Sequence, residues 1–270
     1  MKHSYFWGCD PGLVSDPTGS VLLRVTRPAV VVQEGKVLDA VTGAAMAIPK
    51  DVTIAEFVSP RYSVTNVESR RGLTFSQLGR EAAAIQEDVG GKLTCVVDST
   101  GLGVGATDAI RRASVPCVGV TFTSGTRITG SRWAANVPVS LMFSLMYSVM
   151  SQNRIEVACP AENRLVEELK QVERRVSDQG RESFEVPRGE FGHGDCVYAL
   201  GLCLVIAERS VGRQARSIGL HPGGRERPPG RPRQGSAARQ VIKARLEASR
   251  LQSEATMWRQ IGEDYDPGFE

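Results

Sequence analysis

The stretch Tyr5-Phe6-Trp7-Gly8-Cys9-Asp10-Pro11-Gly12 opens the sequence with an apolar run that ends on a carboxylate and a turn. A short apolar run bounded by turn residues is typical of a buried strand. Asp10 is the last residue of this run, so we expect its carboxylate at the rim of the core, on rigid backbone. The segment therefore predicts the first strand of a sheet and a candidate functional residue at its end.

The residues that follow predict how the sheet begins. A second strand is expected at residues 20–26, and residues 29–33 and 36–40 flank Glu34-Gly35, which is typical of a hairpin. We therefore expect three antiparallel strands at the start of the fold.

Helices alternate with strands in the rest of the core region. The expected helices are residues 74–89, 107–113, 138–152, 160–174 and 195–208, the expected strands are 93–97, 117–122 and 154–157, and residues 175–187 are expected to form a polar hairpin. Thr74 and Gln77 form a capping-box pattern at the start of the first helix. Antiparallel strands followed by alternating helices and strands predict an α/β domain with a mixed central sheet flanked by helices.

The bulk properties indicate an ordinary soluble globular protein. The chain has 270 residues, of which 41% are hydrophobic and 23% charged, and its net charge of +3 does not by itself indicate nucleic-acid binding. The cysteines are scattered without a CxxC pair, so we expect buried free thiols in a reducing compartment. The N-terminus lacks a signal-peptide core, and the longest apolar stretches are too short to span a bilayer. We therefore expect a cytoplasmic protein without membrane contact.

Two further aspartates stand at the ends of apolar segments. Asp98 ends the run 93–97, and Asp195 opens the apolar stretch 196–207. Grouping carboxylates is unfavourable without a cation, because two unit charges about 4 Å apart repel by roughly 4 kcal/mol at an effective dielectric near 20. A divalent metal reverses that sign, and carboxylate oxygens suit magnesium or manganese. The pattern predicts one acidic site assembled by folding, although each aspartate alone is also typical of a turn or a helix cap.

The three acidic segments, in this order, resemble the nuclease domain of the large subunit of tailed-phage terminases. The segments are Gly8-Cys9-Asp10-Pro11-Gly12, Val96-Val97-Asp98-Ser99-Thr100-Gly101 and Gly192-His193-Gly194-Asp195-Cys196-Val197-Tyr198-Ala199-Leu200. The resemblance covers about residues 5–208 and implies a ribonuclease-H-like fold. It also implies a two-metal endonuclease that cuts concatemeric double-stranded DNA during genome packaging in the cytoplasm of the host cell.

The resemblance also implies roles for individual residues. Asp10 would bridge two magnesium or manganese ions, and Asp98 and Asp195 would each complete one side. His193 would be a proton or phosphate partner beside the site, or alternatively a structural residue that caps the last helix.

The sequence departs from the family pattern in two ways. Gly194 and Tyr198 occupy positions where relatives carry acids, which leaves Asp195 as the acid of its segment. The chain also contains no GxxxxGK[ST] phosphate loop. We therefore expect a free-standing nuclease without an ATPase domain of its own, which would depend on a separate packaging ATPase, the portal or the small terminase subunit.

Arginines near the expected site are candidates for DNA binding. Arg127 and Arg132 lie in the glycine-rich loop 123–133, and the region of the expected hairpin contains arginines at positions 174, 175, 181 and 188. Of these, Arg127, Arg132, Arg175 and Arg181 are the DNA-binding candidates. Contacts of this kind would be independent of base sequence and sensitive to salt, although each arginine is also typical of an ordinary solvated surface. Trp133 is expected to be buried under the following helix.

The composition changes after Ser210. We expect residues 1–210 to form the nuclease domain, residues 211–235 to be a basic linker rich in Gly, Pro and Arg, and residues 236–270 to contain an amphipathic helix and tail. The helix could dock a packaging partner or mediate self-association. The alternative is a disordered linker followed by a solvated helix.

Three other functions compete with the packaging nuclease. A Holliday-junction-resolvase-like nuclease shares the superfold and would act on branched DNA. A catalytically weak DNA-binding packaging module is favoured by the acids missing at Gly194 and Tyr198. An actin-like or sugar-kinase ATPase also begins with an aspartate in a glycine turn, but it needs a second phosphate loop that the sequence lacks.

Overall fold

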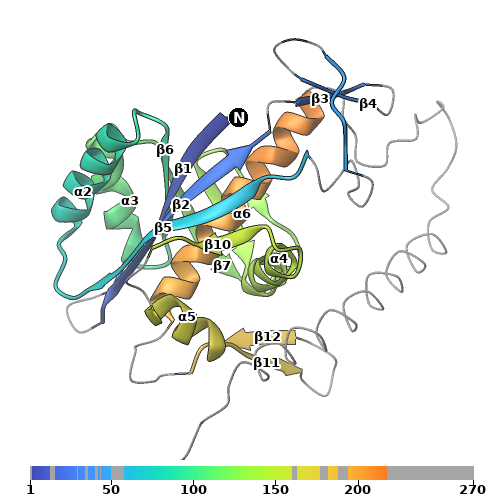
Figure 1. Ribbon diagram of the computed structural model, residues 1–270. Helices are drawn as coiled ribbons and strands as arrows, with labels where there is room; N and C mark the ends of the chain where they lie inside the picture. The colour runs from blue at the N-terminus through green and yellow to red at the C-terminus, as the bar shows by residue number, and fades with distance from the viewer. Residues whose placement is uncertain are drawn as a thin grey trace, which may run out of the picture. The chain divides into compact units, whose positions relative to one another are not determined.

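The computed structural model describes residues 2–12, 16–28, 30–33, 36–39, 42, 44–49, 58–159, 163–176, 182–187 and 194–217. The strands are β1 Lys2–Asp10, β2 Thr18–Arg27, β3 Val30–Gln33, β4 Lys36–Asp39, β5 Arg61–Arg70, β6 Leu93–Asp98, β7 Cys117–Thr123, β8 Thr129–Gly130, β9 Ala134–Pro138, β10 Ile155–Val157, β11 Glu173–Val176 and β12 Glu182–Glu185. The helices are α2 Phe75–Asp88, α3 Gly103–Arg112, α4 Val139–Ser151, α5 Asn163–Lys170 and α6 Asp195–Ser217 (Figure 1).

The central sheet is mixed, as the sequence predicts. Its eight strands have the order β10-β5-β2-β1-β6-β7-β9-β8. Strands β1, β2 and β5 pair antiparallel, and β6, β7 and β9 continue the sheet in parallel from β1. This arrangement confirms the expected α/β fold, in which three antiparallel strands are joined by parallel ones.

The third antiparallel strand differs from the expected one. The hairpin at residues 29–40 does form, as β3 and β4, but it is a separate two-stranded sheet. The central sheet uses β5 instead, where Tyr62, Val64 and Val67 are buried. Polar residues between these positions lower the average hydropathy of β5, and a register shift at Leu22/Leu23 interrupts its pairing with β2. Strict alternation is therefore broken, which is why the pattern was missed.

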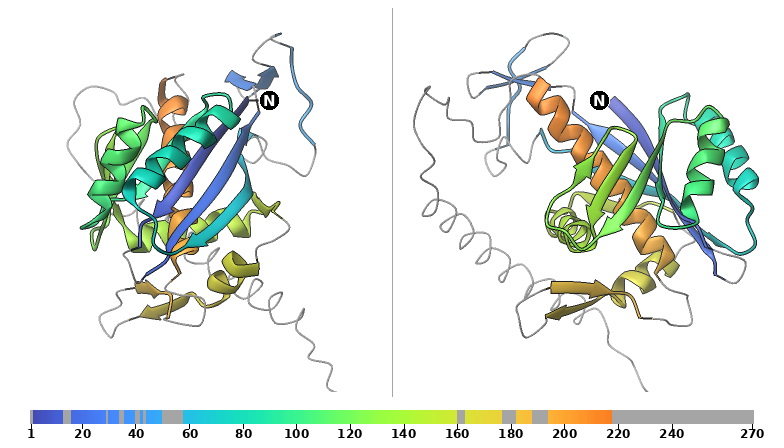
Figure 2. Two further views of the ribbon diagram at one scale, coloured as in Figure 1. Left: turned by 90° about the vertical axis from the view of Figure 1, so that its left-hand side faces the viewer. Right: turned by 180° about the vertical axis from the view of Figure 1, so that it is seen from behind.

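Helices cover both faces of the sheet (Figure 2). On one face, α2 and α3 pack on a core that includes Trp7, Cys9 and Ile110. On the other face, α4 and α6 pack on a larger core that includes Phe6, Val96, Val120 and much of α6. The alternation of strand residues therefore assigns each side chain to one helical layer or the other. The expected capping box is present at α2, where the Thr74 hydroxyl accepts from Gln77 N at 3.2 Å.

Helix α6 lies directly against the backbone of the sheet. A Cβ atom added at Gly8 of β1 would lie 2.0 Å from the Ala199 carbonyl oxygen, and one at Gly19 of β2 would lie 2.4 Å from the Asp195 carbonyl carbon. Neither glycine has room for a side chain. These two glycines therefore determine how closely the beginning of α6 approaches β1 and β2.

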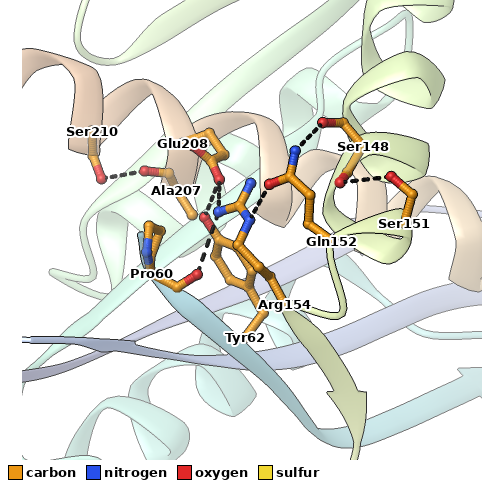
Figure 3. A network of polar contacts seen from close by, with 9 residues as sticks. All are labelled: Pro60, Tyr62, Ser148, Ser151, Gln152, Arg154, Ala207, Glu208 and Ser210. Carbon is orange, nitrogen blue, oxygen red and sulfur yellow. Dashed lines mark hydrogen bonds and ion pairs between the residues drawn. The ribbon is translucent and has the colours of Figure 1, made fainter. Parts of the chain in front are cut away.

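A polar network around Glu208 holds the later part of α6 against the sheet (Figure 3). The Tyr62 hydroxyl donates to Glu208 Oε1 at 2.8 Å, and Arg154 Nη1 donates to the same oxygen at 2.7 Å. Arg154 also donates to the Pro60 carbonyl at 3.3 Å and to Gln152 Oε1 at 2.9 Å. This network joins α6 to β5 and to the segment that follows α4.

We expect Glu208→Ala to destabilise the protein by about 2–3 kcal/mol. The change removes the shared acceptor of Tyr62, which is 1% exposed, and of Arg154, and buried donors without an acceptor are costly. Urea unfolding at pH 7 measures the effect. Glu156→Ala, which removes an exposed carboxylate of β10, is the control and should leave the midpoint unchanged. Equal midpoints for the two variants would contradict the expectation.

The end of α6 differs from the expected one. The sequence becomes polar at Glu208, where the expected helix ends, but α6 continues to Ser217. A helix propagates through its own backbone hydrogen bonds and can continue where the sequence becomes polar, so composition alone misplaces its end. The last turns thus overlap the beginning of the segment expected as a linker, and residues 218–270 lie outside the described residues. No helix within the described part of the chain is long and apolar enough to span a membrane.

Candidate active site

Strand pairing brings Asp10 and Asp98 to one edge of the sheet. β1 and β6 are adjacent and parallel, with Cys9 opposite Val97, so the two aspartates end neighbouring strands at the same level. Successive strand residues alternate between faces. Asp10 shares a face with Phe6, and Asp98 shares a face with Val96, and both of those belong to the core under α6. Both carboxylates therefore project into the layer that contains α6.

Asp195 reaches the same layer from the beginning of α6. It is the first residue of α6, it is 7% exposed, and its main chain lies against Gly19. Gly19 is the β2 residue that pairs with Asp10. The beginning of α6 thus lies beside the end of β1, and the fold brings together Asp10, Asp98 and Asp195 from three distant segments.

The electrostatics of Asp10 reflect this grouping. Burial, followed by the charges of Asp98, Asp195 and Glu168, raises the pKa of Asp10 to about 8. An isolated aspartate titrates near pH 4. The negative charge on Asp10 is therefore poorly tolerated without a cation.

The turn after Asp98 orients its carboxylate. Thr100 N donates to Asp98 Oδ1 at 2.8 Å, and Gly101 adopts a φ of 59° as the chain turns toward α3. A Cβ at Gly103 would lie 1.7 Å from the Asp98 carbonyl oxygen, so this turn requires glycine for close packing. The glycine-rich sequence after Asp98 thus has a structural reason.

Glu168 is a site residue that the sequence reasoning missed. It lies on α5, which is found with the β11–β12 hairpin beside the beginning of α6 (Figures 1 and 2). Its side chain is 1% exposed, and its Oε2 accepts from Cys196 N at 3.0 Å and from Val197 N at 3.2 Å. Arg164 Nε donates to its other oxygen at 2.9 Å. Glu168 therefore caps α6 immediately after Asp195.

A signal for Glu168 was present in the sequence. Residues 160–174 show an amphipathic pattern with Leu165 and Leu169 on the apolar face. Glu168 lies three residues after Leu165, so it falls on the same side of the helix. An acid on the buried face of an amphipathic helix requires a partner, and here the partners are the first N–H groups of α6 and Arg164.

Tyr198 also lies at the site. It follows Asp195 by three residues, in the first turn of α6, and its ring makes edge contacts with Phe122 at 5.6 Å and Phe143 at 5.7 Å between centroids. Burial, then Asp10, Glu185 and Asp98, raise the pKa of its phenol. The charges of these carboxylates thus act on the Tyr198 phenol.

The arginines predicted to bind DNA make different contacts in the structure. Arg127 is exposed in the loop after β7. The Arg132 guanidinium lies 4.7 Å from the Trp133 ring centroid. Arg175 pairs with Glu173 at 3.0 Å and with Glu185 at 2.9 Å on the hairpin, and its side chain is 60% exposed.

The expectation for Trp133 is wrong. Its side chain is 45% exposed, because strand β9 lies between Trp133 and the expected helix, which forms as α4. β9 pairs with β7 and leaves Trp133 at the outer part of the sheet. Arg181, Arg188 and His193 lie outside the described residues.

The donor chemistry of the site fits a hard cation. Asp10, Asp98, Asp195 and Glu168 supply carboxylate oxygens, which magnesium and manganese prefer. Within the described residues, however, no three Asp, Glu, His or Cys side chains converge as a ready-made metal cage. Glu168 is committed to the α6 backbone and to Arg164, which leaves the three aspartates as the candidate ligands.

No family model and no curated protein matches the sequence. Among solved structures, the large terminase nuclease of thermophilic phage G20c is similar, with 18% identity over 75% of this chain and 81% of that chain and a TM-score of 0.45. The large terminase nuclease domain of Thermus phage P74-26 gives 19% identity over 74% and 78%, with a TM-score of 0.42. The g2p (large terminase) nuclease domain of bacteriophage SPP1 with bound Mn gives 12% over 77% and 86%, with a TM-score of 0.40.

These proteins are of the kind that the three acidic segments resemble. At such identities the likeness concerns the path of the chain. The activity has to be inferred from the residues of the site.

Proposed function

We propose that the protein is a metal-dependent endonuclease that cuts double-stranded DNA during phage genome packaging. The observation that supports this function best is the position of Asp10, whose pKa is raised to about 8 by burial and by Asp98, Asp195 and Glu168. Such a like-charge cluster at one edge of a sheet is unfavourable by itself and becomes favourable around a divalent cation. Sites with perturbed carboxylates of this kind are typical of catalytic centres.

The three aspartates would hold two magnesium or manganese ions, with Asp10 between Asp98 and Asp195. Bound ions would activate a water and stabilise the leaving 3′ oxygen of a phosphodiester. The chain's own contribution is to fix the three carboxylates: Asp10 and Asp98 on paired strands, and Asp195 on a helix that Glu168 caps. His193 would assist as a proton or phosphate partner.

Arginines around the site would bind the phosphate backbone. Arg127 lies between β7 and β8, Arg132 lies between β8 and β9, and Arg175 is on β11. Arg181 is the fourth candidate from the sequence. A protein of this function would work in the host cytoplasm with a separate packaging ATPase, the portal or the small terminase subunit. Residues 236–270 would supply the docking or self-association segment.

Plasmid cleavage tests this function. Wild type is incubated with manganese, magnesium or EDTA beside Asp10→Asn, Asp98→Asn and Asp195→Asn. We expect each variant to lose on the order of a thousandfold in rate, because loss of one metal-binding carboxylate removes several kcal/mol of transition-state stabilisation. Asp108→Asn, which changes an exposed aspartate of α3, is the matched control and should cut like wild type. Equal cutting by all the proteins would show that the site is wrongly assigned.

A catalytically weak DNA-binding packaging module is the second candidate function. It is favoured by the surroundings of Asp195, where Gly194 and Tyr198 supply no carboxylate. In that case wild type binds duplex DNA and leaves the plasmid intact with every metal. A resolvase-like activity would instead show faster cutting of branched than of linear DNA.

A further inference from the structure

The ring of Tyr198 is held rigidly beside the acidic site. Phe122 contacts it edge-on with an interplanar angle of 65°, and Phe143 does so with an angle of 81°. Phe143 in turn stacks on Phe184 of β12 at 5.1 Å. Aromatic contacts on two sides leave the ring of Tyr198 little freedom to rotate away.

The supporting residues belong to the same sheet edge as the aspartates. Asp98 pairs with Val120, and Phe122 lies two residues farther along β7, on the same face. The backbone N–H of Phe122 donates to Thr100 Oγ1 at 3.4 Å, which ties it to the turn that orients Asp98. Tyr198 therefore lies over the strand ends that carry the acids, one helical turn from Asp195.

The Tyr198 hydroxyl is a hydrogen-bond donor near several negatively charged carboxylates. It makes no hydrogen bond to any described residue, although the charges of Asp10, Asp98 and Glu185 are close enough to act on it. The side chain of Tyr198 is half-buried. A phenol in this position can donate to an oxygen of a ligand that enters the site.

We propose that the Tyr198 hydroxyl donates a hydrogen bond to a non-bridging oxygen of the DNA phosphate at the acidic site. This role rests on the proposed nuclease function and adds a residue that contacts the substrate. A phosphodiester carries acceptor oxygens and no donor, which complements a fixed O–H group.

Tyr198→Phe tests this role, because it removes the hydroxyl and retains the aromatic contacts with Phe122 and Phe143. Single-turnover cleavage of a linear duplex in manganese is compared for wild type, Tyr198→Phe and the control Tyr5→Phe, which changes a partly exposed tyrosine of β1. We expect Tyr198→Phe to lower the rate by about 10- to 100-fold, the usual effect of losing a hydrogen bond to a charged group. The melting temperature should remain that of wild type.

Two further measurements separate contact with the phosphate from a structural role. Duplex binding in calcium should weaken severalfold for Tyr198→Phe and stay unchanged for Tyr5→Phe. A phosphorothioate at the scissile position should slow wild type in one of its two diastereomers, because sulfur is a weak acceptor, and should slow Tyr198→Phe less.

The outcomes distinguish this role from the nuclease function itself. If wild type cuts and Tyr198→Phe cuts equally fast, the role of Tyr198 is refuted and the nuclease function stands. If Tyr198→Phe is slow only because it has lost thermal stability, the role is also refuted. If wild type cuts with neither manganese nor magnesium, the nuclease function falls and the role of Tyr198 falls with it.

Discussion

Asp10→Asn is expected to stabilise the metal-free protein at pH 8 while it abolishes cleavage. The folded-state pKa of Asp10 is about 8, and an unfolded aspartate titrates near 3.9. Between these values the folded state holds a proton that the unfolded state has lost. The stability contributed by this group is therefore complete below about pH 4 and is lost as pH rises toward 8.

The magnitude follows from the same linkage. Each pH unit in this window is worth up to about 1.4 kcal/mol, and solvent screening of the half-buried carboxylate reduces the total, so we expect a gain of about 1–3 kcal/mol for Asp10→Asn at pH 8. Urea unfolding in EDTA at pH 5 and pH 8 measures it. Wild type should lose more stability than the variant between the two values.

Asp108→Asn is the matched control, since it removes an exposed carboxylate. It should retain the pH dependence of wild type. If the stability of Asp10→Asn depends on pH in the same way as that of wild type, then the negative charge on Asp10 does not destabilise the folded protein. A more stable but inactive variant would show the opposite, namely that the site is arranged for function at the expense of stability.

Glu168→Ala is expected to destabilise the protein by about 3–5 kcal/mol. The change removes the acceptor of Cys196 N and Val197 N and the ion-pair partner of Arg164, all at a buried helix start. Glu168→Gln keeps a side-chain oxygen that can accept hydrogen bonds from Cys196 N and Val197 N, so it should lose less stability than Glu168→Ala. Unfolding by urea at pH 7 ranks the variants.

The adjacent Glu167 provides the control for Glu168. Its side chain is 39% exposed and pairs with Lys170 at 3.1 Å, so Glu167→Ala should change stability by less than about 0.5 kcal/mol. Similar losses for Glu167→Ala and Glu168→Ala would contradict the capping role of Glu168. Because Asp195 precedes the capped residues, Glu168→Ala should also reduce cleavage at temperatures where it remains folded.

Local sequence patterns were sufficient to predict the ends of strands and helices where an apolar run meets a polar residue. The strand ends at Asp10 and Asp98 and the helix start at Asp195 follow from apolar runs that border a carboxylate. Pairing of parallel strands then brings two of these ends together without further information. The fold class and the adjacency of the strand ends at Asp10 and Asp98 could therefore be predicted, and the role of the three aspartates stays a prediction.

Long-range contacts explain what could not be predicted. Whether a largely polar segment with broken alternation joins the central sheet depends on its partner strand, so β5 was missed and the β3–β4 hairpin was predicted in its place. Trp133 was expected to be buried under the following helix, but strand β9, which pairs with β7, lies between Trp133 and α4. Glu168 depends on the helix end that it meets in space, which spacing along the chain does not reveal.

The close approach of α6 to Gly8 and Gly19 has a consequence for how the site tolerates change. At both glycines the nearest atom of the helix belongs to its main chain, namely the Ala199 carbonyl oxygen at Gly8 and the Asp195 carbonyl carbon at Gly19. Substitutions elsewhere in the core can alter packing without inserting a spacer between Asp195 and Asp10. A side chain at Gly8 or Gly19 would push the beginning of α6 away from the sheet and so increase the separation of Asp195 from Asp10.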